Sequence, residues 1–323
     1  MKKFLALLFC LTILLSFAAC SSESSTDTDS ESGSESQTDS ESESTNDTNS
    51  ENENESESTT DNESESAPDN DKITFEGLTV VDNAECKINI TDIDSYNFWG
   101  YTLDVKLENK SSEKTYMFAL ESASVNGVQC NPIFASEIAA GKKANEKIIF
   151  LDNELKENGI TKFTDIELTF RVYDSHNLLA DDVFKKTVHV YPYGEENAEN
   201  FERQPQDSDR VIVDNQYVTV IVTGYEHDNI WGYSANLFVI NKTEDDIMVS
   251  VDQASVNGYM IDPFFATSVS PQKCAFDAIS WFDSSLEENG IEKVEEIEFT
   301  LRIYRTNDWL GDDLFNQTVT LNP

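Results

Sequence analysis

The stretch ESASVNG at residues 121–127 returns as DQASVNG at residues 252–258. Other words repeat in the same order, namely WGY at 99–101 and 231–233, ENGI at 157–160 and 288–291, and DDVF at 181–184 against DDLF at 312–315. Self-similarity at a fixed spacing is the mark of a duplicated structural unit. The sequence therefore predicts two copies of one domain, at residues 73–192 and 210–323, joined by a polar linker at 193–209.

Each copy alternates apolar and polar residues with the period of a half-buried β-strand. In WGYTLDVKLEN this alternation places Trp99 and Tyr101 on the inward face, together with three later aliphatic residues. The other expected inward residues of the first copy are Cys86, Ile88, Ile90, Tyr116, Phe118, Leu120, Ile166, Leu168, Phe170 and Val172. Short strands separated by turn signals predict an all-β chain of two tandem immunoglobulin-like antiparallel β-sandwiches.

Turn and helix signals divide the strands. Asn-Gly at residues 126–127 and 257–258 predicts type I′ hairpin turns, which need two residues that tolerate positive φ. The segment LDNELKENGI predicts one short helix, begun by Asp152 as its cap, with Leu155 facing inward. Asn-Gly at 158–159 should end it, and the second copy repeats the pattern.

The N-terminus reads as an export signal. Two lysines precede an apolar run, and small residues precede Cys20, so we expect a signal peptide at residues 1–19. The small-small-Cys ending resembles the lipobox of bacterial lipoproteins, although Phe17 stands where that pattern prefers leucine. Lipidation of Cys20 would anchor the protein to the outer face of the bacterial cell membrane, because two acyl chains give durable binding. An ordinary cleaved secretion signal is the alternative.

Residues 20–72 carry an acidic segment rich in Ser, Thr and Asn. It has 18 Asp and Glu between residues 21 and 71, no Lys or Arg, and nothing large to bury, so we expect a disordered, extended tether. The whole chain has a net charge of −40, and residues 72–323 keep −24 of it. Such a surface repels nucleic-acid phosphates, so we expect no nucleic-acid partner.

The repeated words also carry a resemblance. The order W-G-Y, N-K-S/T, S-V-N-G, G-K-K, E-N-G-I, I-E and R-V-Y, behind a lipobox and an acidic stalk, resembles uncharacterised lipoproteins of Firmicutes. Those proteins carry an immunoglobulin-like domain of unknown function, in a superfamily that includes a secreted mycobacterial antigen. The resemblance implies a fold and a location, and it implies no catalytic residues. Gln272-Lys273-Cys274 departs from G-K-K in the second copy.

Few residues offer chemistry. His176, His189 and His227 are the only histidines, and none recurs between the copies, which favours surface positions. Asp181-Asp182 and Asp312-Asp313 do recur, and paired carboxylates could bind Ca²⁺ or serve a hydrolase. Ca²⁺ takes six to eight oxygens, however, and a solvated turn is the favoured interpretation. We expect no cofactor.

The three cysteines beyond Cys20 are too scattered for a disulfide framework or a zinc site. Cys86 alternates with inward isoleucines and should be a buried, inert thiol. A bridge from Cys130 to Cys86 is the less favoured alternative. Cys274 takes the place of Lys143 and should be exposed, with a free thiol or an intermolecular disulfide as alternatives.

Three loop aromatics are the candidates for ligand binding, namely Trp309, Tyr259 and Phe264. The favoured interpretation is that they cover the open end of a sandwich. Taken together, the sequence favours a lipid-anchored binding or scaffold protein at the bacterial cell surface that engages a protein or glycan, without catalysis. A cell-wall hydrolase or its accessory using the Asp pairs, and a purely mechanical spacer, are the alternatives.

Overall fold

The computed structural model describes residues 72–229 and 232–323, and β-strands dominate both ranges. The first half has β1 (Leu78–Asp82), β2 (Cys86–Asn97), β3 (Gly100–Asn109), β4 (Tyr116–Val125), β5 (Val128–Cys130), β6 (Ala135–Ile138), β7 (Lys143–Phe150), α2 (Asp152–Glu157), β8 (Ile166–Asp174), β9 (Phe184–Val190) and η2 (Glu195–Asn197). The second half has β10 (Arg210–Asp214), β11 (Val218–Asn229), β12 (Gly232–Asn241), β13 (Ile247–Val256), β14 (Tyr259–Met260), β15 (Ala266–Val269), β16 (Cys274–Trp281), α3 (Asp283–Glu288), β17 (Ile297–Arg305), η3 (Thr306–Asp308) and β18 (Phe315–Leu321). The predicted all-β fold is confirmed.

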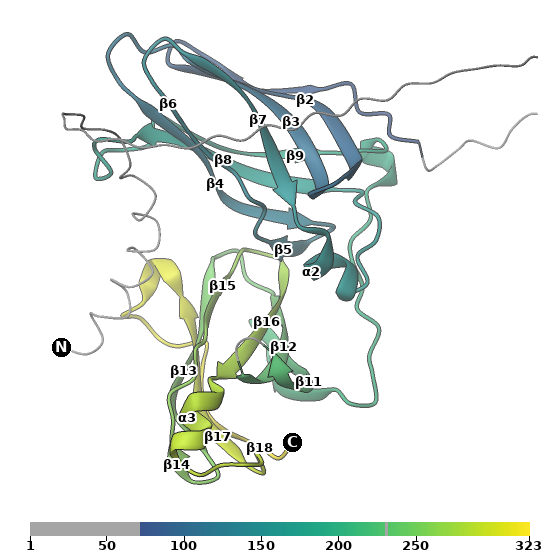
Figure 1. Cartoon of the computed structure of the whole chain (residues 1–323), viewed down its shortest axis with the longest axis vertical. Helices are drawn as coiled ribbons and strands as arrows, with labels where there is room; N and C mark the ends of the chain where they lie inside the picture. The colour runs from purple at the N-terminus through teal and green to yellow at the C-terminus, as the bar shows by residue number, and fades with distance from the viewer. Residues whose placement is uncertain (1–71, 230–231) are drawn as a thin grey trace, which may run out of the picture. The chain divides into compact units, whose positions relative to one another are not determined.

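The strands of each half form two layers with the same connectivity. In the first half, the order β1-β2-β3-β7 makes one sheet, and β5-β4-β8-β9 makes the other, with β6 also on β4. In the second half, β10-β11-β12-β16 and β14-β13-β17-β18 repeat these two orders, with β15 on β13. Figure 1 shows β2, β3 and β7 in one layer and β4 and β8 in the layer facing it. The duplication in the sequence is therefore matched strand by strand.

Apolar side chains fill the space between the layers of each half as two separate clusters. Cys86, Ile88 and Ile90 of β2 are fully buried in the first cluster, as the alternation predicted. Val218, Val220 and Val222 of β11 occupy the corresponding places in the second. The strand predicted from DIELTFRVY buries all its expected inward residues. Burial of these faces supplies the main driving force for folding.

A parallel pair joins the two halves. Cys274 in β16 pairs with Val128 in β5, and this links one sheet of each half into a nine-stranded sheet. Beside this pair, the Gln129 side chain donates to the Ser268 carbonyl at 2.6 Å and accepts from the Ser270 amide at 2.9 Å. The two halves therefore share direct backbone and side-chain hydrogen bonds.

The segment predicted as a polar linker packs against its neighbours. Phe201 donates its amide to the Asn126 carbonyl at 2.8 Å, and its ring lies 5.9 Å from the ring of Phe276. Arg203 makes a double hydrogen bond to Asp209 at 2.6 and 2.7 Å. These contacts hold the segment at residues 193–209 against its neighbours. Its polar composition did not predict them.

Both predicted hairpin turns are confirmed. Asn126 and Gly127 have φ values of 52° and 81°, and they connect the paired residues Val125 and Val128. Residues 257–258 repeat the geometry with φ values of 50° and 82°. Two successive residues at positive φ define the type I′ turn, whose twist suits a two-residue hairpin.

Both predicted helices are present, but their first residues differ from the expectation. Leu151 rather than Asp152 is the N-cap of α2, without a side-chain capping bond, and Phe282 takes this place in α3. Asp152 is instead the first helical residue. The inward Leu155 is confirmed as buried, and the helix ends before Gly159, whose φ is 86°.

The signal peptide at 1–19, Cys20, and residues 20–71 of the acidic segment lie outside the described residues. Among the residues that are described, no helix combines the length and apolarity needed to cross a bilayer.

Candidate functional site

The two Asp pairs lie just before the last strand of each half, and arginines engage one member of each pair. Arg171 donates to Asp182 at 2.7 Å, and Arg302 donates to Asp313 at 2.9 Å. Each arginine also lies over a tyrosine ring two residues along its strand, at 4.6 and 4.4 Å from the ring centroid. The first members of the pairs, Asp181 and Asp312, are exposed. Arg171 and Arg302 already occupy the carboxylates of Asp182 and Asp313. This favours a structural role for these ion pairs over binding of a metal ion by the same carboxylates.

Within residues 72–229 and 232–323, no three His, Cys, Asp or Glu side chains lie together in a group that could hold a metal ion.

The histidines occupy three unrelated environments. His176 is exposed in the turn after β8. His189 lies 2.7 Å from an Asp165 carboxylate oxygen and stacks on Tyr191. His227 is exposed near the end of β11, and its ring meets Tyr233 edge to face at 4.7 Å between centroids. The Ser175 hydroxyl lies 3.3 Å from Nδ1 of His176, in an exposed turn. His227 borders the cavity of the second half.

All three cysteines in the described part of the chain are free thiols. Cys86 is fully buried, as predicted, and burial raises the pKa of its thiol to about 11. The Cys86–Cys130 bridge is not formed. The expectation that Cys274 is exposed is wrong, because β16 meets β5 at this residue. Its thiol contacts the Gly127 carbonyl at 3.6 Å, and burial raises its pKa to about 11.

The three aromatic residues selected from the sequence are exposed but lie on different elements. Tyr259 belongs to β14, Phe264 forms an isolated bridge with Ser280, and Trp309 follows η3. Their exposed side chains confirm that they do not fill the core.

A denser group of exposed aromatics lies at the tip of the β2–β3 hairpin, and we name Tyr96, Phe98 and Trp99 the aromatic tip. Their side chains are 97%, 90% and 63% exposed. The prediction that Trp99 faces the core is wrong. Asn97 pairs with Gly100, so Phe98 and Trp99 form the two-residue turn between the strands and project into solvent. The rings of Phe98 and Trp99 meet edge to face at 5.2 Å.

Two polar side chains hold the aromatic tip in place. Asp94 accepts from the Tyr96 amide at 3.1 Å and from the Asn97 side-chain amide at 2.9 Å. Asn97 in turn accepts from the Trp99 amide at 3.1 Å. The Asn97 hydrogen bond, followed by that of the Tyr96 amide, lowers the pKa of Asp94 below its ordinary value. The exposed rings are thus carried on a turn with its own hydrogen bonds.

The two halves differ in how one corner of the core is filled. In the first half, the rings of Tyr101 and Phe163 lie 4.4 Å apart, and Phe150 lies 5.7 Å from Phe163. In the second half, the equivalents of Tyr101 and Phe163 are Tyr233 and Val294. Replacing a phenyl ring by an isopropyl group removes volume that the surrounding framework does not recover.

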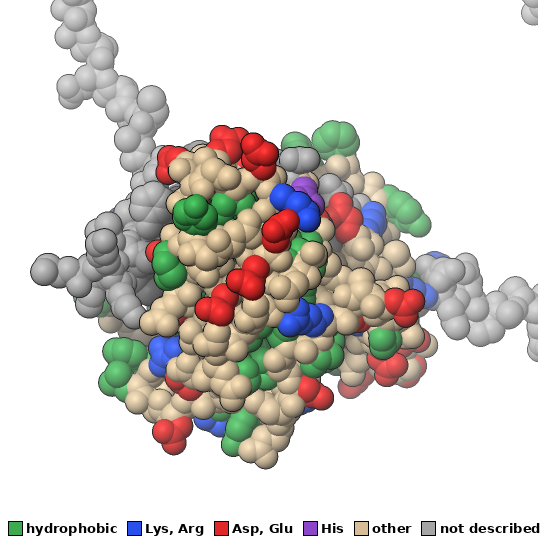
Figure 2. Space-filling view, turned by 90° about the horizontal axis from the view of Figure 1, so that it is seen from below, with side chains coloured by type: hydrophobic (Ala, Val, Ile, Leu, Met, Phe, Trp, Pro, Cys, Tyr) green, Lys and Arg blue, Asp and Glu red, His purple; other side chains and the backbone are tan. Residues whose placement is uncertain are grey.

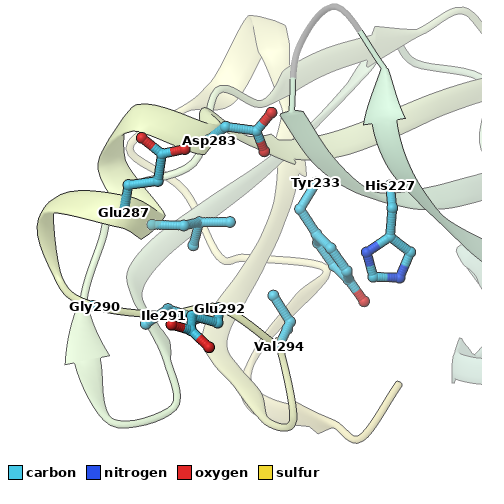
Figure 3. Close-up of a pocket in the computed structure, with 9 residues that line it drawn as sticks. His227, Tyr233, Asp283, Glu287, Gly290, Ile291, Glu292 and Val294 are labelled. Atoms are coloured by element: carbon cyan, nitrogen blue, oxygen red, sulfur yellow. The ribbon is translucent and has the colours of Figure 1, made fainter.

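A cavity of about 480 Å³ lies at this corner of the second half. Figure 3 shows its walls, with Asp283 and Glu287 on the α3 side and Tyr233 and His227 on the facing strands. The remaining lining residues are Leu286, Gly290, Ile291, Glu292 and Val294. The cavity therefore combines apolar side chains with three carboxylates.

Tyr233 carries the most unusual polar group of this cavity. Its side chain is only 3% exposed, and its hydroxyl has no hydrogen-bond partner within the described residues. Burial raises the pKa of this hydroxyl well above its ordinary value, so it is protonated at neutral pH. A buried hydroxyl without a partner costs free energy, since it has lost its hydrogen bonds to water.

Gly232 sets the position of Tyr233. Its φ is +89°, and an added Cβ atom would lie 2.3 Å from the Trp281 carbonyl oxygen. Only glycine fits so close to another backbone, which explains why glycine stands at the second position of the WGY motif at residues 231–233. This close approach brings the start of β12 against the end of β16, just before α3.

Residues 72–323 carry more acidic than basic side chains. Figure 2 shows one face of the molecule, on which Asp and Glu side chains are interspersed with Lys, Arg and hydrophobic side chains. This agrees with the net charge of −24 on residues 72–323.

Sequence reasoning missed both the aromatic tip and the cavity. Simple alternation placed Trp99 inward because it extended β3 by one residue into the turn. The word SYNFWGY did contain a signal, because polar Asn97 and Gly100 flank two aromatic residues as turn residues flank a hairpin. The cavity had a weaker signal, namely the change from Phe163 to Val294 at matching positions.

Comparisons with known proteins give only distant likenesses. No protein-family model matches the chain, and no curated protein does. It is similar to the YadV chaperone at 12% identity and a TM-score of 0.21, over 68% of this chain and 92% of that one. It is similar to a protein of unknown function from Porphyromonas gingivalis W83 at 12% identity and 0.19, over 77% and 100%. Red sea bream transglutaminase matches at 8% and 0.20, over 75% of this chain and 31% of its own. TM-scores this low carry no argument about function.

Proposed function

We propose that this chain is a lipid-anchored binding or scaffold protein on the outer face of a bacterial cell membrane. In this proposal two immunoglobulin-like domains, at residues 73–192 and 210–323, stand on the acidic tether and engage a protein or glycan ligand. The membrane is its partner through a lipid on Cys20. The protein acts by binding and performs no catalysis.

The observation that carries the proposal is the aromatic tip. Scattered single hydrophobic residues are ordinary on protein surfaces, but three aromatic residues within four positions at one hairpin tip are not. Aromatic side chains dominate the energetics of protein interfaces, because they bury large areas with few rotatable bonds. The Asp94 and Asn97 hydrogen bonds supply order before binding, which reduces the entropy lost on association.

The ion pairs of the recurring Asp residues favour the same proposal over a wall hydrolase. An acid or base in a glycosidase must be free to exchange a proton with its substrate. Asp182 and Asp313 instead accept hydrogen bonds from arginines, and each arginine is held against a tyrosine. This supports a role for the pairs in holding β8 to β9 and β17 to β18.

The binding proposal is tested with the full mature chain, kept soluble by Cys20→Ala. Wild type and a triple variant, Tyr96→Ser with Phe98→Ser and Trp99→Ser, are titrated onto purified cell walls and onto arrays of glycans and surface proteins. We expect the triple variant to lose about tenfold or more in affinity, since hot-spot aromatics each contribute at least that much.

A matched control replaces three exposed aromatics elsewhere, as Tyr259→Ser with Phe264→Ser and Trp309→Ser. It should bind within about twofold of wild type, because these residues lie on separate elements. A wild-type chain that binds nothing in any arm would leave the mechanical spacer as the better account. If only the control variant lost binding, the binding surface would lie at Tyr259, Phe264 and Trp309 rather than at the aromatic tip.

The anchor is tested by fractionating cells that express the full chain. With Cys20 intact, the processed protein should remain with the membrane, because a diacylated cysteine gives durable anchoring. Cys20→Ala should release it to the medium or leave it unprocessed. Membrane retention of a processed Cys20→Ala protein would contradict the anchor.

A further inference from the structure

The cavity beside Tyr233 has the size of a small-molecule site. Its volume of about 480 Å³ falls within the range in which proteins bind organic ligands. It is far larger than one metal ion requires, and no metal-binding group of side chains occurs among the described residues. The shape therefore suits an organic ligand.

The charged groups of the cavity indicate the sign of the charge that the ligand carries. Asp283, Glu287 and Glu292 line it, whereas no Lys or Arg does. Three carboxylates around one space favour a cation, and the acidic surface beyond them adds to the attraction. Because these carboxylates are exposed, their contribution should fall as salt is added.

The buried side of the cavity selects the form of the cation. Leu286, Ile291 and Val294 offer apolar contact, which suits an alkyl chain. The Tyr233 hydroxyl is buried and has no hydrogen-bond partner among the described residues, so it can accept a hydrogen bond from an N–H donor. Figure 3 shows the Tyr233 ring extending beside His227, with its hydroxyl at the far end. A primary ammonium can donate to this oxygen, whereas a quaternary ammonium cannot.

We propose that the second half binds a primary alkylammonium group in the cavity lined by Tyr233, Val294 and the carboxylates of Asp283, Glu287 and Glu292. The ammonium donates to the Tyr233 oxygen and faces the carboxylates, while its alkyl chain packs on the apolar side chains. The first half differs at this position, because the Phe163 ring stands in place of Val294 and lies 4.4 Å from the Tyr101 ring. Lys156 and Thr161 also stand there in place of Glu287 and Glu292.

The test is calorimetric titration of the full mature chain carrying Cys20→Ala with n-butylammonium, at low and moderate salt. We expect saturable binding at one site, weaker at the higher salt. Tetramethylammonium should bind about threefold to tenfold more weakly, because it has no N–H to donate to Tyr233. Spermidine and Nα-acetyl-lysine methylamide then distinguish a free polyamine from a peptide lysine as the natural source of the group.

Three variants locate the site. Val294→Phe restores the ring of the first half and should weaken butylammonium binding about tenfold or more. Tyr233→Phe removes only the hydroxyl and should weaken it about threefold to tenfold. Glu287→Gln with Glu292→Gln changes exposed residues, so it should fold normally while reducing both the affinity and its salt dependence.

The matched control is Tyr101→Phe, which makes the same change in the first half and should leave binding unchanged. The proposal is overturned if wild type shows no saturable binding, or if Val294→Phe binds as well as wild type. Equal affinity for tetramethylammonium would overturn the hydrogen bond to Tyr233. Loss of binding in Tyr101→Phe would place the ligand in the wrong half.

Discussion

Asp94 shows how much of a candidate binding surface depends on one exposed carboxylate. It accepts two hydrogen bonds that fold the chain into the aromatic tip, from the Tyr96 amide and the Asn97 side chain. Both bonds favour the ionised carboxylate, so the pKa of Asp94 lies below its ordinary value. The order of the tip is therefore coupled to the charge of this residue.

Lowering the pH should loosen the aromatic tip. A carboxyl with a depressed pKa in the folded protein contributes its stabilisation above its ordinary value and loses it as the pH falls through the lowered value. We expect the heteronuclear NOE of the Tyr96, Phe98 and Trp99 amides to decrease as the pH falls through the lowered pKa of Asp94, and Asp94→Ala to reproduce that decrease at pH 7. Asp181→Ala, at an exposed loop position, is the control. Unchanged NOE values in Asp94→Ala would show that other contacts order the tip.

At the scale of the element, equivalent strands carry side chains of different size. Tyr101 and Tyr233 are the second residues of β3 and β12, Phe150 and Trp281 end β7 and β16, and Phe163 and Val294 follow the helices. The last pair replaces a phenyl ring with an isopropyl group, whereas Trp281 is larger than its counterpart Phe150. The first half thus has a filled corner and the second a cavity.

Exchanging the residues of this pair should change stability in opposite directions. Phe163→Val creates a cavity in a well-packed core and should lower the free energy of unfolding by about 2 kcal/mol. Val294→Phe adds buried apolar surface at an existing cavity and should raise it by about 1 kcal/mol. Urea denaturation with an unchanged m-value measures both. Destabilisation of similar size in both variants would show that the second half has no room for a ring.

At the scale of the whole molecule, the halves meet through hydrogen bonds that the repeat does not share. Gln129 in β5 holds the Ser268 carbonyl and the Ser270 amide of the second half. Its counterpart, Met260, is exposed in β14. A duplicated unit has therefore acquired different residues at the position where one copy contacts the other.

Gln129→Ala should destabilise the chain more than Met260→Ala does. The change leaves the Ser268 and Ser270 backbone groups without their partner, which costs about 1–3 kcal/mol. Met260→Ala, at an exposed position, should stay within about 0.5 kcal/mol of wild type. Thermal unfolding of the two variants gives the comparison. Equal effects would mean that the Gln129 hydrogen bonds add nothing to stability.

Prediction from sequence worked where a local rule determines the structure. Asn126-Gly127 specified its turn because few other residue pairs tolerate two positive φ angles. The alternation at Cys86, Ile88 and Ile90 specified a buried face because a strand has a period of two. Prediction failed where contacts between distant segments decide. Cys274 is covered by β5, which lies about half the chain away, and no local pattern reports that approach.

Trp99 failed for a different reason. Alternation gives the phase of a strand but not where it begins, and β3 begins at Gly100, one residue later than expected, because Phe98 and Trp99 form the turn. The cavity could be predicted only by comparing Phe163 with Val294 at matching positions of the two copies. Val294 taken alone is an ordinary buried core residue.

The central claim is that a duplicated sandwich is solid in one copy and accepts a ligand in the other. NMR of the full mature chain with ¹³C-labelled tyrosine rings tests it most directly, because Tyr101 and Tyr233 occupy equivalent positions in the two halves. Adding n-butylammonium should shift the ring signals of Tyr233 and leave those of Tyr101 in place. Equal shifts of both rings, or a shift of neither, would contradict it.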